Sequence, residues 1–495
     1  MKNFTTLFFV MAAMFASLPM YSESVWDGTA DMWTAGSGTI SDPYQIETAQ
    51  QLSFIAEMVN GGVTTYSGKY FVLTNDINLN NIEWTPIGTT YKFAATFDGA
   101  GHTIKGLWVT ASRTYNGLIG MTISPIKNLS VSGRVNNGIY SGGVVASSSS
   151  SITNCINAGT VSAYSTAYST YAGGIVGYTS GSVTNCSNTG NVSSSLRITT
   201  NNSTFYSISC GGIVGAKSNS GSEILNCTNI GRVSSDVSSS STTSAKVYSY
   251  SGGIVGSCSV TAVTVKHCIN FGAVSSSVNA SVSSEKNAYS GGIVGSCNVS
   301  SGTVLLVAYC YNIGKISSQF NSSGIACNCN VNSSYSVGLL EGGKSTYGVG
   351  NGSLTNSYYL ESRGATTGGM SKSSASMKSI SFPIILNGSG ETVFVQDVNN
   401  INDGYPVFAW QNDNAIMVSC NSAQGSTTGS GSYVSGSTAK ISATPNSGYI
   451  FTGWNDGDTT NPRTITVTGN AHYVALFEQA VINIKVGQDC TITQE

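Results

Sequence analysis

The chain has 495 residues, but only 9% of them are Asp, Glu, Lys or Arg, and the formal net charge is -2. This balance gives no attraction to nucleic acid or to an anionic membrane surface, so neither is an expected partner. Gly is abundant, and Val, Ile, Thr and Tyr are common where helix-favouring charged residues are scarce. Such a composition favours strands joined by many turns, and we expect an all-β protein.

Residues 1–24 have the pattern of a secretory signal peptide. Lys2 precedes the apolar stretch FTTLFFVMAAMFASLPM, which is too short for a stable membrane span, and small residues follow it. We expect cleavage between Ala16 and Ser24, and an extracellular or cell-surface location. No later stretch approaches 18 apolar residues, so no transmembrane span is expected in the mature chain.

The segment 25–110 begins with one predicted helix. Thr48 and Gln51 form a capping box, and Asn60-Gly61 predicts a left-handed stop. The residues that share the apolar face are Leu52, Ile55, Ala56 and Val59. Short apolar or alternating runs follow, each closed by Asn, Gly or Pro, and they predict the first strands. The helix would therefore cap the edge of a stack of strands.

Internal repeats occupy residues 111–365. Gly-rich runs such as GGIVG recur, and each is followed by a hexapeptide of the form NCxNxG or a close variant. The cysteine of each hexapeptide is the second residue: Cys155, Cys186, Cys227, Cys268 and Cys310. Repetition of one pattern at intervals along the chain predicts a solenoid in which every repeat forms one coil.

In a parallel stack, strands lie about 4.8 Å apart and each repeated side chain packs on its own copy. We predict GGIVG as a strand, the hexapeptide as a corner, and Asn amide ladders at the bends. The inward side chains of one coil and the next would be Ile175, Val183, Cys186 and Val192, then Ile213, Ile224, Cys227 and Val233.

The ladder cysteines have three interpretations. Buried free thiols that act as small apolar side chains are favoured, because parallel side chains and an odd count do not suit pairing. Disulfides are the second interpretation, with Cys258 and Cys297 as the expected pair, since both lie in GGIVGSC. A metal site is the third; only Cys327-Asn-Cys329 comes near a ligand spacing, and no His lies nearby.

Insertions at one point of the repeats combine Tyr with Ser, Thr, Gly and Asn, a composition typical of adaptable binding surfaces. One interpretation is a row of loops that binds a glycan or protein. Its candidate contacts are Tyr168, Tyr171, Tyr206, Tyr248, Tyr250 and Tyr289. The alternative is that the loops are solvated spacers and each Tyr packs on the coil below. Tyrosines turned wholly onto the coil would exclude the binding surface.

The run GLIG at 117–120, the recurring GGIVG and the NCxNxG pattern resemble the GLUG motif, a short repeat of bacterial secreted and surface proteins. The resemblance implies a right-handed parallel β-helix over 111–365, with its N-terminal cap and first coils at 25–110 and a closing cap at 366–412. GLUG repeats also accompany the catalytic domain of immunoglobulin A-cleaving metallopeptidases, but the HExxH of that domain is absent here.

Residues 413–478 resemble the divergent internalin-type B-repeat, a small β-rich module of bacterial surface proteins. The resemblance rests on ATPNSGYIFTGW and on YVALF at 473–477. Tyr449, Phe451, Trp454 and Phe477 would form its core. The tail, 479–495, matches no sorting signal.

Polysaccharide-cleaving β-helix enzymes need carboxylates gathered on one face, or a calcium site. Between Gly138 and Leu340 the acids are only Glu223, Asp236 and Glu285, in different repeats. We therefore expect no catalytic residue, no metal and no cofactor. The predicted function is an exported adhesin or binding protein, monomeric, with a glycan or an extracellular protein as partner. The alternatives are a structural stalk or surface-layer component without a specific ligand and, less favoured, a polysaccharide-active β-helix enzyme.

Overall fold

The computed structural model describes residues 25–480, except 200–204, 220, 240–244, 260–262, 281–284, 298–304, 390–391, 398, 413, 422, 435 and 470. The predicted signal peptide lies outside the described residues, as does nearly all of the predicted tail. The chain divides into two compact units, Thr5–Glu391 and a unit that contains Thr392–Glu495. This division falls inside 366–412, the segment predicted as a single closing cap.

The first unit opens with helix α2 (Ala49–Asn60), which confirms the predicted capping helix. The Thr48 side chain accepts a hydrogen bond from the Gln51 backbone nitrogen at 3.3 Å. The predicted apolar face is fully buried at Leu52, Ile55, Ala56 and Val59. The predicted left-handed stop is off by one residue: Gly61 still has a φ of -74°, and Gly62 supplies the positive φ of 70°.

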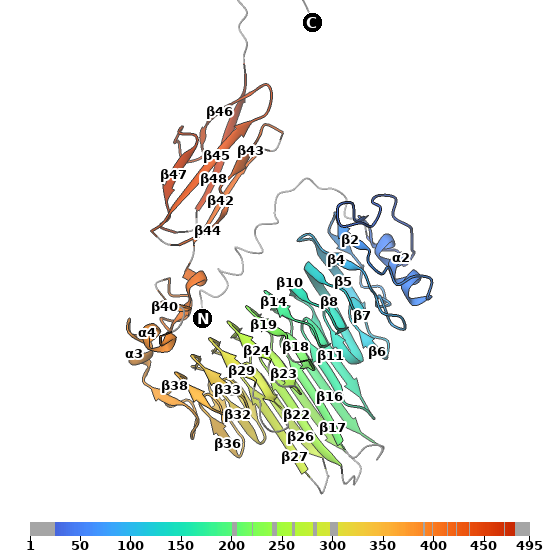
Figure 1. Cartoon of the computed structure of the whole chain (residues 1–495), viewed down its shortest axis with the longest axis vertical. Helices are drawn as coiled ribbons and strands as arrows, with labels where there is room; N and C mark the ends of the chain where they lie inside the picture. Colours follow the sequence, from blue (N-terminus) through green and yellow to red (C-terminus); the bar gives the residue numbers. More distant parts are fainter. Residues whose placement is uncertain are drawn as a thin grey trace, which may run out of the picture. The chain divides into compact units, whose positions relative to one another are not determined.

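The coils of the first unit stack through parallel strand pairs, so the predicted parallel β-helix is confirmed (Figure 1). One sheet has six strands in the order β28-β23-β18-β13-β9-β7, and a 33-stranded sheet forms the other walls. Register is kept from coil to coil, as in the run Val145, Val176, Val214, Val255 and Val294. We call such a set of in-register positions a column.

The strands of the larger sheet up to β21 are β1 (Tyr44–Ile46), β2 (Tyr70–Leu73), β3 (Ile77–Asn78), β4 (Thr96–Asp98), β5 (Thr103–Val109), β6 (Arg113–Asn116), β8 (Ile126–Gly142), β10 (Ile152–Asn157), β11 (Thr160–Ser165), β12 (Thr170–Gly173), β14 (Val183–Thr184), β15 (Ser187–Asn188), β16 (Val192–Ile198), β17 (Phe205–Gly211), β19 (Glu223–Leu225), β20 (Thr228–Asn229) and β21 (Val233–Ser239). It continues with β22 (Lys246–Gly252), β24 (Thr264–Lys266), β25 (Ile269–Asn270), β26 (Val274–Ala280), β27 (Glu285–Gly291), β29 (Leu306–Ala308), β30 (Tyr311–Asn312), β31 (Ile316–Ser318), β32 (Asn321–Ser323), β33 (Asn330–Asn332), β34 (Tyr335–Ser336), β35 (Leu340–Glu341), β36 (Ser345–Tyr347), β37 (Leu354–Thr355), β38 (Tyr358–Leu360) and β39 (Met370–Lys372). The six-stranded sheet contains β7 (Ile119–Thr122), β9 (Val145–Ser148), β13 (Val176–Thr179), β18 (Val214–Lys217), β23 (Val255–Cys258) and β28 (Val294–Cys297).

The hexapeptide forms a corner of each coil, as predicted, but its turning residue is the first one and not the Gly. The residues at that place have a left-handed φ between 50° and 54°: Asn154, Asn185, Asn226, His267 and Tyr309. Asn tolerates this conformation better than most residues. The Gly is needed for space, because a Cβ at Gly190 would overlap the Gly159 carbonyl of the neighbouring coil.

The GGIVG run also lies at a corner, where we had predicted a strand. Strand β12 ends at Gly173 and β13 begins at Val176, so the residues between them form the bend. A Cβ at Gly174 would overlap the carbonyl of Gly212 and the amide of Asn188. Close stacking of the corners therefore requires glycine in coil after coil.

The predicted inward columns are confirmed. Val183 pairs with Ile224, and Val192 pairs with Val233. All eight predicted inward side chains are at most 1% exposed: Ile175, Val183, Cys186, Val192, Ile213, Ile224, Cys227 and Val233. The apolar interior of the β-helix is one continuous cluster that reaches from the capping helix to the last coils.

An amide ladder runs beside this interior, as predicted. Each Asn donates from Nδ2 to the Oδ1 of the next, at 2.7 to 2.9 Å: Asn157, Asn188, Asn229, Asn270 and Asn312. Each Nδ2 also donates to the carbonyl two residues ahead, at 2.7 to 2.9 Å. Every buried amide is therefore hydrogen-bonded in two directions, which removes the cost of burying it.

The insertions are not simple loops, because their arms continue the sheet. Strands β16, β21 and β26 pair in one layer, and β17, β22 and β27 pair in a second layer. We call these two layers the sheet extension. Its own apolar core is made by Leu196, Ile198, Tyr206, Ile208, Val237, Ala245, Val247, Val278, Ala280 and Ala288.

A seam of buried hydroxyls lies between the sheet extension and the interior of the coils. Ser194 lies 2.8 Å from the Thr170 hydroxyl, Ser235 lies 2.6 Å from Ser249, and Ser276 lies 2.7 Å from Ser290. The first pair links β16 to β12, and the other two link β21 to β22 and β26 to β27. Because these hydroxyls hydrogen-bond to one another, burying them between two apolar cores costs little free energy.

Short helices follow the last coil of the first unit. Phe382 of α4 (Phe382–Asn387) meets the rings of Tyr335 and Tyr358 at centroid distances of 6.3 and 5.3 Å. Helix α3 (Ser374–Met377) buries Met377. These residues pack against the last coils and lie in the segment 366–412 that was predicted as the closing cap.

The second unit is a small β-rich module, as predicted. Its elements are β40 (Phe394–Val395), β41 (Val407–Phe408), η2 (Ala409–Asn412), β42 (Asn414–Cys420), β43 (Gly425–Thr428), β44 (Gly431–Tyr433), β45 (Thr438–Pro445), β46 (Tyr449–Trp454), β47 (Arg463–Thr466) and β48 (Ala471–Gln479). Trp454 and Phe477 lie in its core, and Tyr449 and Phe451 pack against that core. The four predicted aromatic core residues therefore do come together.

Candidate binding site

A column of tyrosines lies two residues before the first Gly of three successive Gly-rich runs, which begin at Gly117, Gly142 and Gly173. Tyr115, Tyr140 and Tyr171 are in register, and their rings stack at 5.2 and 5.0 Å with interplanar angles of 18° and 12°. Tyr178 meets the second and third rings edge-on at 5.7 Å. The next position of the column is Ser209, which ends this stack.

A cleft opens beside this stack, where the insertion lengthens from one coil to the next. Residues 166–169 join β11 to β12 directly, whereas β16 and β17 of the following coil extend well beyond them. The cleft has a volume of about 360 Å³. We call it the aromatic cleft, and its lining residues are Ile139, Tyr140, Ala167, Tyr168, Ser169, Tyr171, Phe205 and Tyr206.

Hydroxyl hydrogen bonds hold the rim of the aromatic cleft in place. The Ser165 hydroxyl accepts from the Tyr168 backbone nitrogen at 2.9 Å and from the Ala167 nitrogen at 3.2 Å. Ser169 accepts from the Ser207 nitrogen at 3.0 Å, which ties the short insertion to the longer strand beside it. The rim is therefore a formed structure that presents Tyr168 with its side chain 65% exposed.

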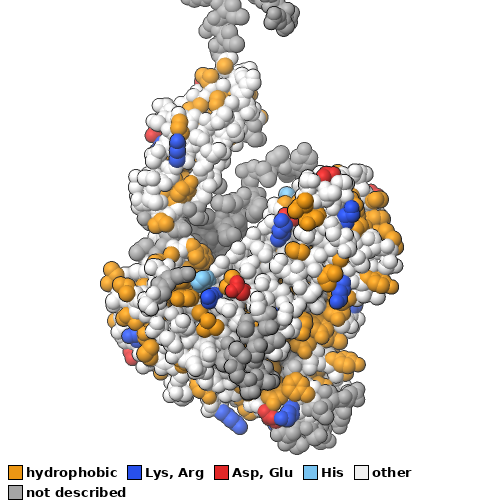
Figure 2. All heavy atoms as spheres, viewed as in Figure 1, with side chains coloured by type: hydrophobic (Ala, Val, Ile, Leu, Met, Phe, Trp, Pro, Cys, Tyr) orange, Lys and Arg blue, Asp and Glu red, His pale blue; other side chains and the backbone are white. Residues whose placement is uncertain are grey.

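Among the described residues that line the aromatic cleft, the tyrosines are the only ionisable ones. Burial raises the pKa of Tyr140 to about 12, and the neighbouring Tyr171 adds to the shift. The pKa of Tyr171 is also raised, again mainly by burial. Both phenols therefore stay protonated at neutral pH and can donate hydrogen bonds. Figure 2 likewise shows charged side chains thinly scattered over the face that it draws.

The structure separates the six candidate tyrosines into two groups. Tyr168, Tyr171 and Tyr206 line the aromatic cleft. Tyr206 requires a correction, because it is only 1% exposed and belongs to the core of the sheet extension. It forms the floor of the cleft and is not an adaptable loop contact. Since Tyr168 is exposed, the tyrosines are not all turned onto the coil.

The second group lies on β22 and β27. Tyr250 stacks on Tyr289 at 5.6 Å and on Tyr248 at 6.0 Å. Lys246 and Glu285 form a 2.9 Å ion pair beside them. Tyr250 is only 5% exposed, so its prediction as a ligand contact is corrected to a packing role. None of these three tyrosines lines the aromatic cleft.

The sequence prediction missed Tyr140, which lines the cleft, and also Tyr115 and Tyr178, which pack against the stacked rings without lining the cleft. A signal for two of them was present, since Tyr115 and Tyr140 stand in the same Tyr-x-Gly setting as Tyr171. The sequence prediction considered tyrosines of the long insertions, and the short coil that carries Tyr140 has no insertion. The alignment of successive coils was needed to show that these rings stack.

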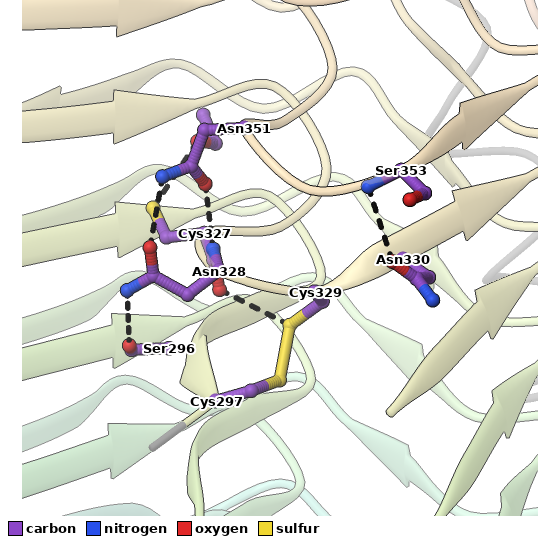
Figure 3. The surroundings of a disulfide bond; sticks show 9 residues. Ser296, Cys297, Cys327, Asn328, Cys329, Asn330, Asn351 and Ser353 are labelled. Atoms are coloured by element: carbon purple, nitrogen blue, oxygen red, sulfur yellow. Dashed lines mark hydrogen bonds between the residues drawn. A yellow bond between two sulfur atoms is a disulfide. The ribbon is translucent and has the colours of Figure 1, made fainter. Parts of the chain in front are cut away.

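The five ladder cysteines are buried free thiols, as the favoured interpretation predicted: Cys155, Cys186, Cys227, Cys268 and Cys310. The predicted Cys258–Cys297 pair is wrong. Cys297 is bonded to Cys329, with a Cα separation of 5.8 Å, and Cys258 is free (Figure 3). The two bonded residues lie in adjacent coils. The disulfide therefore joins stacked neighbours, as in the predicted pair, but Cys297 is bonded to the following coil and not to the preceding one.

Within the described residues, no group of three or more His, Cys, Asp or Glu side chains is arranged to hold a metal ion. In the same residues, no helix has the length and apolar character needed to cross a bilayer.

Two family models match the chain. The GLUG motif matches residues 168–193, which include Tyr168 and Tyr171 of the aromatic cleft, and the divergent InlB B-repeat domain matches residues 416–481. No curated protein matches the sequence. Among solved structures, a "putative immunoglobulin A1 protease from Bacteroides ovatus" is similar at 21% identity, over 76% of this chain and 94% of that chain, with a TM-score of 0.45. The chain is therefore a repeat protein of surface or secreted type that carries a GLUG motif in its β-helix and a divergent InlB B-repeat domain after it.

Proposed function

We propose that this protein is an exported, monomeric adhesin that binds a neutral glycan in the aromatic cleft, after removal of an N-terminal signal peptide. The observation that carries the proposal is the lining of the cleft, in which four tyrosines and a phenylalanine surround about 360 Å³. A concave site with aromatic walls and a few polar groups is the usual form of a small-ligand site.

The chemistry of the lining favours a sugar among neutral ligands. A pyranose has an apolar face that packs on an aromatic ring, and a rim of hydroxyls that exchange hydrogen bonds. Tyr168 offers an exposed ring, and Tyr140 and Tyr171 offer protonated hydroxyls. Tyr presents this contact area at a small cost in side-chain entropy, because few bonds must be fixed.

The proposal makes the protein a binder and not an enzyme. Glycoside hydrolysis requires a pair of carboxylic acids beside the bound sugar. In the part of the chain that the structure describes, no Asp, Glu or His lines the aromatic cleft. A sugar held there would meet rings, hydroxyls and backbone only.

A glycan array with residues 25–495, followed by calorimetry on the best ligand, tests the proposal. We expect Tyr168→Ala to weaken binding about fivefold, since one aromatic contact contributes about 1 kcal/mol. Tyr164→Ala is the matched control: Tyr164 belongs to the same insertion and is 40% exposed, but it does not line the cleft. We expect this control to bind within twofold of the unchanged protein.

Two results would overturn the proposal. Full binding by Tyr168→Ala would place the ligand outside the aromatic cleft. Absence of binding to every glycan, by a protein whose circular dichroism shows a folded β-structure, would favour the alternative of a structural stalk.

A further inference from the structure

Three cysteines follow one another in a single buried column of the six-stranded sheet and the coil beyond it. Cys258 on β23 is in register with Cys297 on β28, and Cys297 is bonded to Cys329 of the next coil. All three are at most 5% exposed. The middle cysteine therefore has a cysteine neighbour on each side, of which one is bonded and the other is a free thiol.

The free thiol lies within bonding reach of the middle cysteine. Paired parallel strands are about 4.8 Å apart, and a disulfide accepts Cα separations of about 4.4 to 6.8 Å. Cys258 and Cys297 are partners in such a pair of strands. The column also gives the order Cys258, Cys297, Cys329 along one direction, which is the arrangement that in-line attack on a disulfide sulfur requires.

A lysine occupies the next place in the same column. Lys217 on β18 is in register with Cys258, and its side chain is completely buried. Its Nζ has no hydrogen-bond partner among the residues that the structure describes. An unpaired buried ammonium is costly, so burial lowers the pKa of Lys217 to about 8, against a smaller opposing effect of Cys258.

The lysine and the thiol complement each other chemically. Burial raises the pKa of Cys258 to about 12, while Lys217 acts in the opposite direction and favours its thiolate. A thiol is reactive toward a disulfide only as the thiolate. Because the pKa of Lys217 is about 8, its amine is largely neutral at pH 8.5 and can accept a proton. Transfer from a thiol with a pKa of about 12 is unfavourable, so the Cys258 thiolate is a minor species, and this species is the one that attacks the disulfide.

We propose that Cys258, Cys297 and Cys329 form a thiol–disulfide exchange site in which Lys217 accepts the proton of the attacking thiol. The Cys258 thiolate attacks Sγ of Cys297, a Cys258–Cys297 bond forms, and the Cys297–Cys329 bond breaks. The electron pair of the broken bond goes to Sγ of Cys329, which takes up one proton. The step consumes one thiol and one disulfide and yields one of each, so no oxidant or reductant is needed.

Exchange would move a covalent link from one pair of coils to the adjacent pair. The link between Cys297 and Cys329 joins the last two coils that carry a cysteine in this column, whereas a link between Cys258 and Cys297 joins the pair before them. The surroundings of the observed disulfide are held by amide contacts: Asn351 donates to Asn328 at 2.8 Å, and Asn328 donates to Ser296 at 3.1 Å (Figure 3). These bonds do not involve Cys258 and would remain while the link moves.

Peptide mapping during reoxidation tests the proposal. The protein is reduced with a phosphine, freed of reductant, and reoxidised with oxidised glutathione at pH 8.5. Samples taken over time are denatured, alkylated and digested with trypsin. The three cysteines fall in different peptides, 247–266, 287–315 and 316–344, so the two linkages have different masses, and fragmentation separates Cys297 from Cys310 and Cys329 from Cys327.

We expect the Cys258–Cys297 linkage to form early and then to convert into Cys297–Cys329. In Cys329→Ser the first linkage should be the end product. In the conversion, Cys329 attacks Cys297 and Cys258 departs, so Lys217 returns the proton to the Cys258 sulfur. In Lys217→Met and Lys217→Arg, neither of which can release a proton to that sulfur, we expect conversion to slow about tenfold. Thr179→Val, which alters the next residue of the column without touching this chemistry, should convert at the original rate.

A purely structural lysine would change the stability of the protein but not the rate of conversion in the folded state, which circular dichroism monitors in every variant. Absence of the Cys258–Cys297 linkage both in the unchanged protein and in folded Cys329→Ser overturns the exchange site. Conversion by Lys217→Met at the original rate overturns the role of Lys217. Glycan binding is measured separately, so failure of this proposal is independent of the aromatic cleft.

Discussion

The interior of the coils and the sheet extension are built from the same repeats but held in different ways. The coil interior is fixed by its corners, where left-handed Asn residues and close-packed glycines leave no freedom in how successive coils stack. The sheet extension has no such corners within its described part, and two layers meet across a small apolar core. We infer that the coils determine the spacing of the stack, and that the extension follows it.

The largest loss of stability is expected when a side chain is added at a corner, where successive coils lie too close together to accommodate it. In Gly212→Val, the added carbons would overlap the Gly253 carbonyl and the Asn229 amide. We expect a loss of about 4 kcal/mol in the free energy of unfolding, because backbone in two coils must move. Denaturant unfolding measures it, with the exposed Arg197→Ala as control. A loss below 1 kcal/mol would show that the corners are not rigid.

A change in the sheet extension should have a smaller and more local effect. Ile208 is fully buried in the core of the extension, and Ile208→Ala should cost about 3 kcal/mol. We expect faster amide hydrogen exchange in β16, β17, β21 and β22 and no change in the amides of β13 and β18. Equal acceleration in both sets would mean that the two cores unfold as one.

The buried amide ladder comes next. Asn229→Ala removes the acceptor of Asn188 and the donor to Asn270, and leaves buried polar groups without partners. We expect a loss of about 2 kcal/mol in thermal unfolding experiments. The neighbouring Thr228→Ala, which removes a half-buried side chain outside the ladder, should cost less than half as much. Equal costs would argue against the ladder as a source of stability.

The smallest effect concerns pH. Burial raises the pKa of Cys227 above its ordinary value, so the folded protein holds this thiol proton where the unfolded chain, with a pKa of about 8.5, releases it. Stability from this thiol is complete below pH 8.5 and declines as pH rises above it. Between pH 7.5 and 9.5 the decline should be about 1 kcal/mol smaller in Cys227→Ala than in the unchanged protein. An identical decline would show that Cys227 does not titrate on unfolding.

Periodic and local features of the fold could be predicted from the sequence, because each depends on a few neighbouring residues. The capping pair of Thr48 and Gln51, the hexapeptide corner and the inward columns are of this kind. The strands β16 and β17 could not be predicted, because Ser-rich arms pair only after the coils have been stacked. Cys329 was not predicted as the partner of Cys297, because the coils that carry Cys258 and Cys329 differ in length. Their cysteines are therefore recognised as one column only when the coils are aligned.

The candidate site could be predicted only in part, because it too depends on how adjacent coils stack. Tyr168 and Tyr171 were found because the insertion that contains them is conspicuous, but the cleft arises from a difference in length between adjacent coils. Such a difference has no signature within any single repeat. It becomes visible only when the strands are aligned and Tyr140 is seen to stack on Tyr171.

The pairing of β16, β21 and β26 also constrains how this gene can change. Because β16, β21 and β26 have the same length, a duplication or deletion of one whole long repeat would still place matching arms side by side. Strand β31, with three residues, and strand β11, with six, flank the seven-residue arms on either side. Long repeats should therefore be gained or lost singly in related genes, while the aromatic cleft at their border would survive only where a short repeat still precedes them.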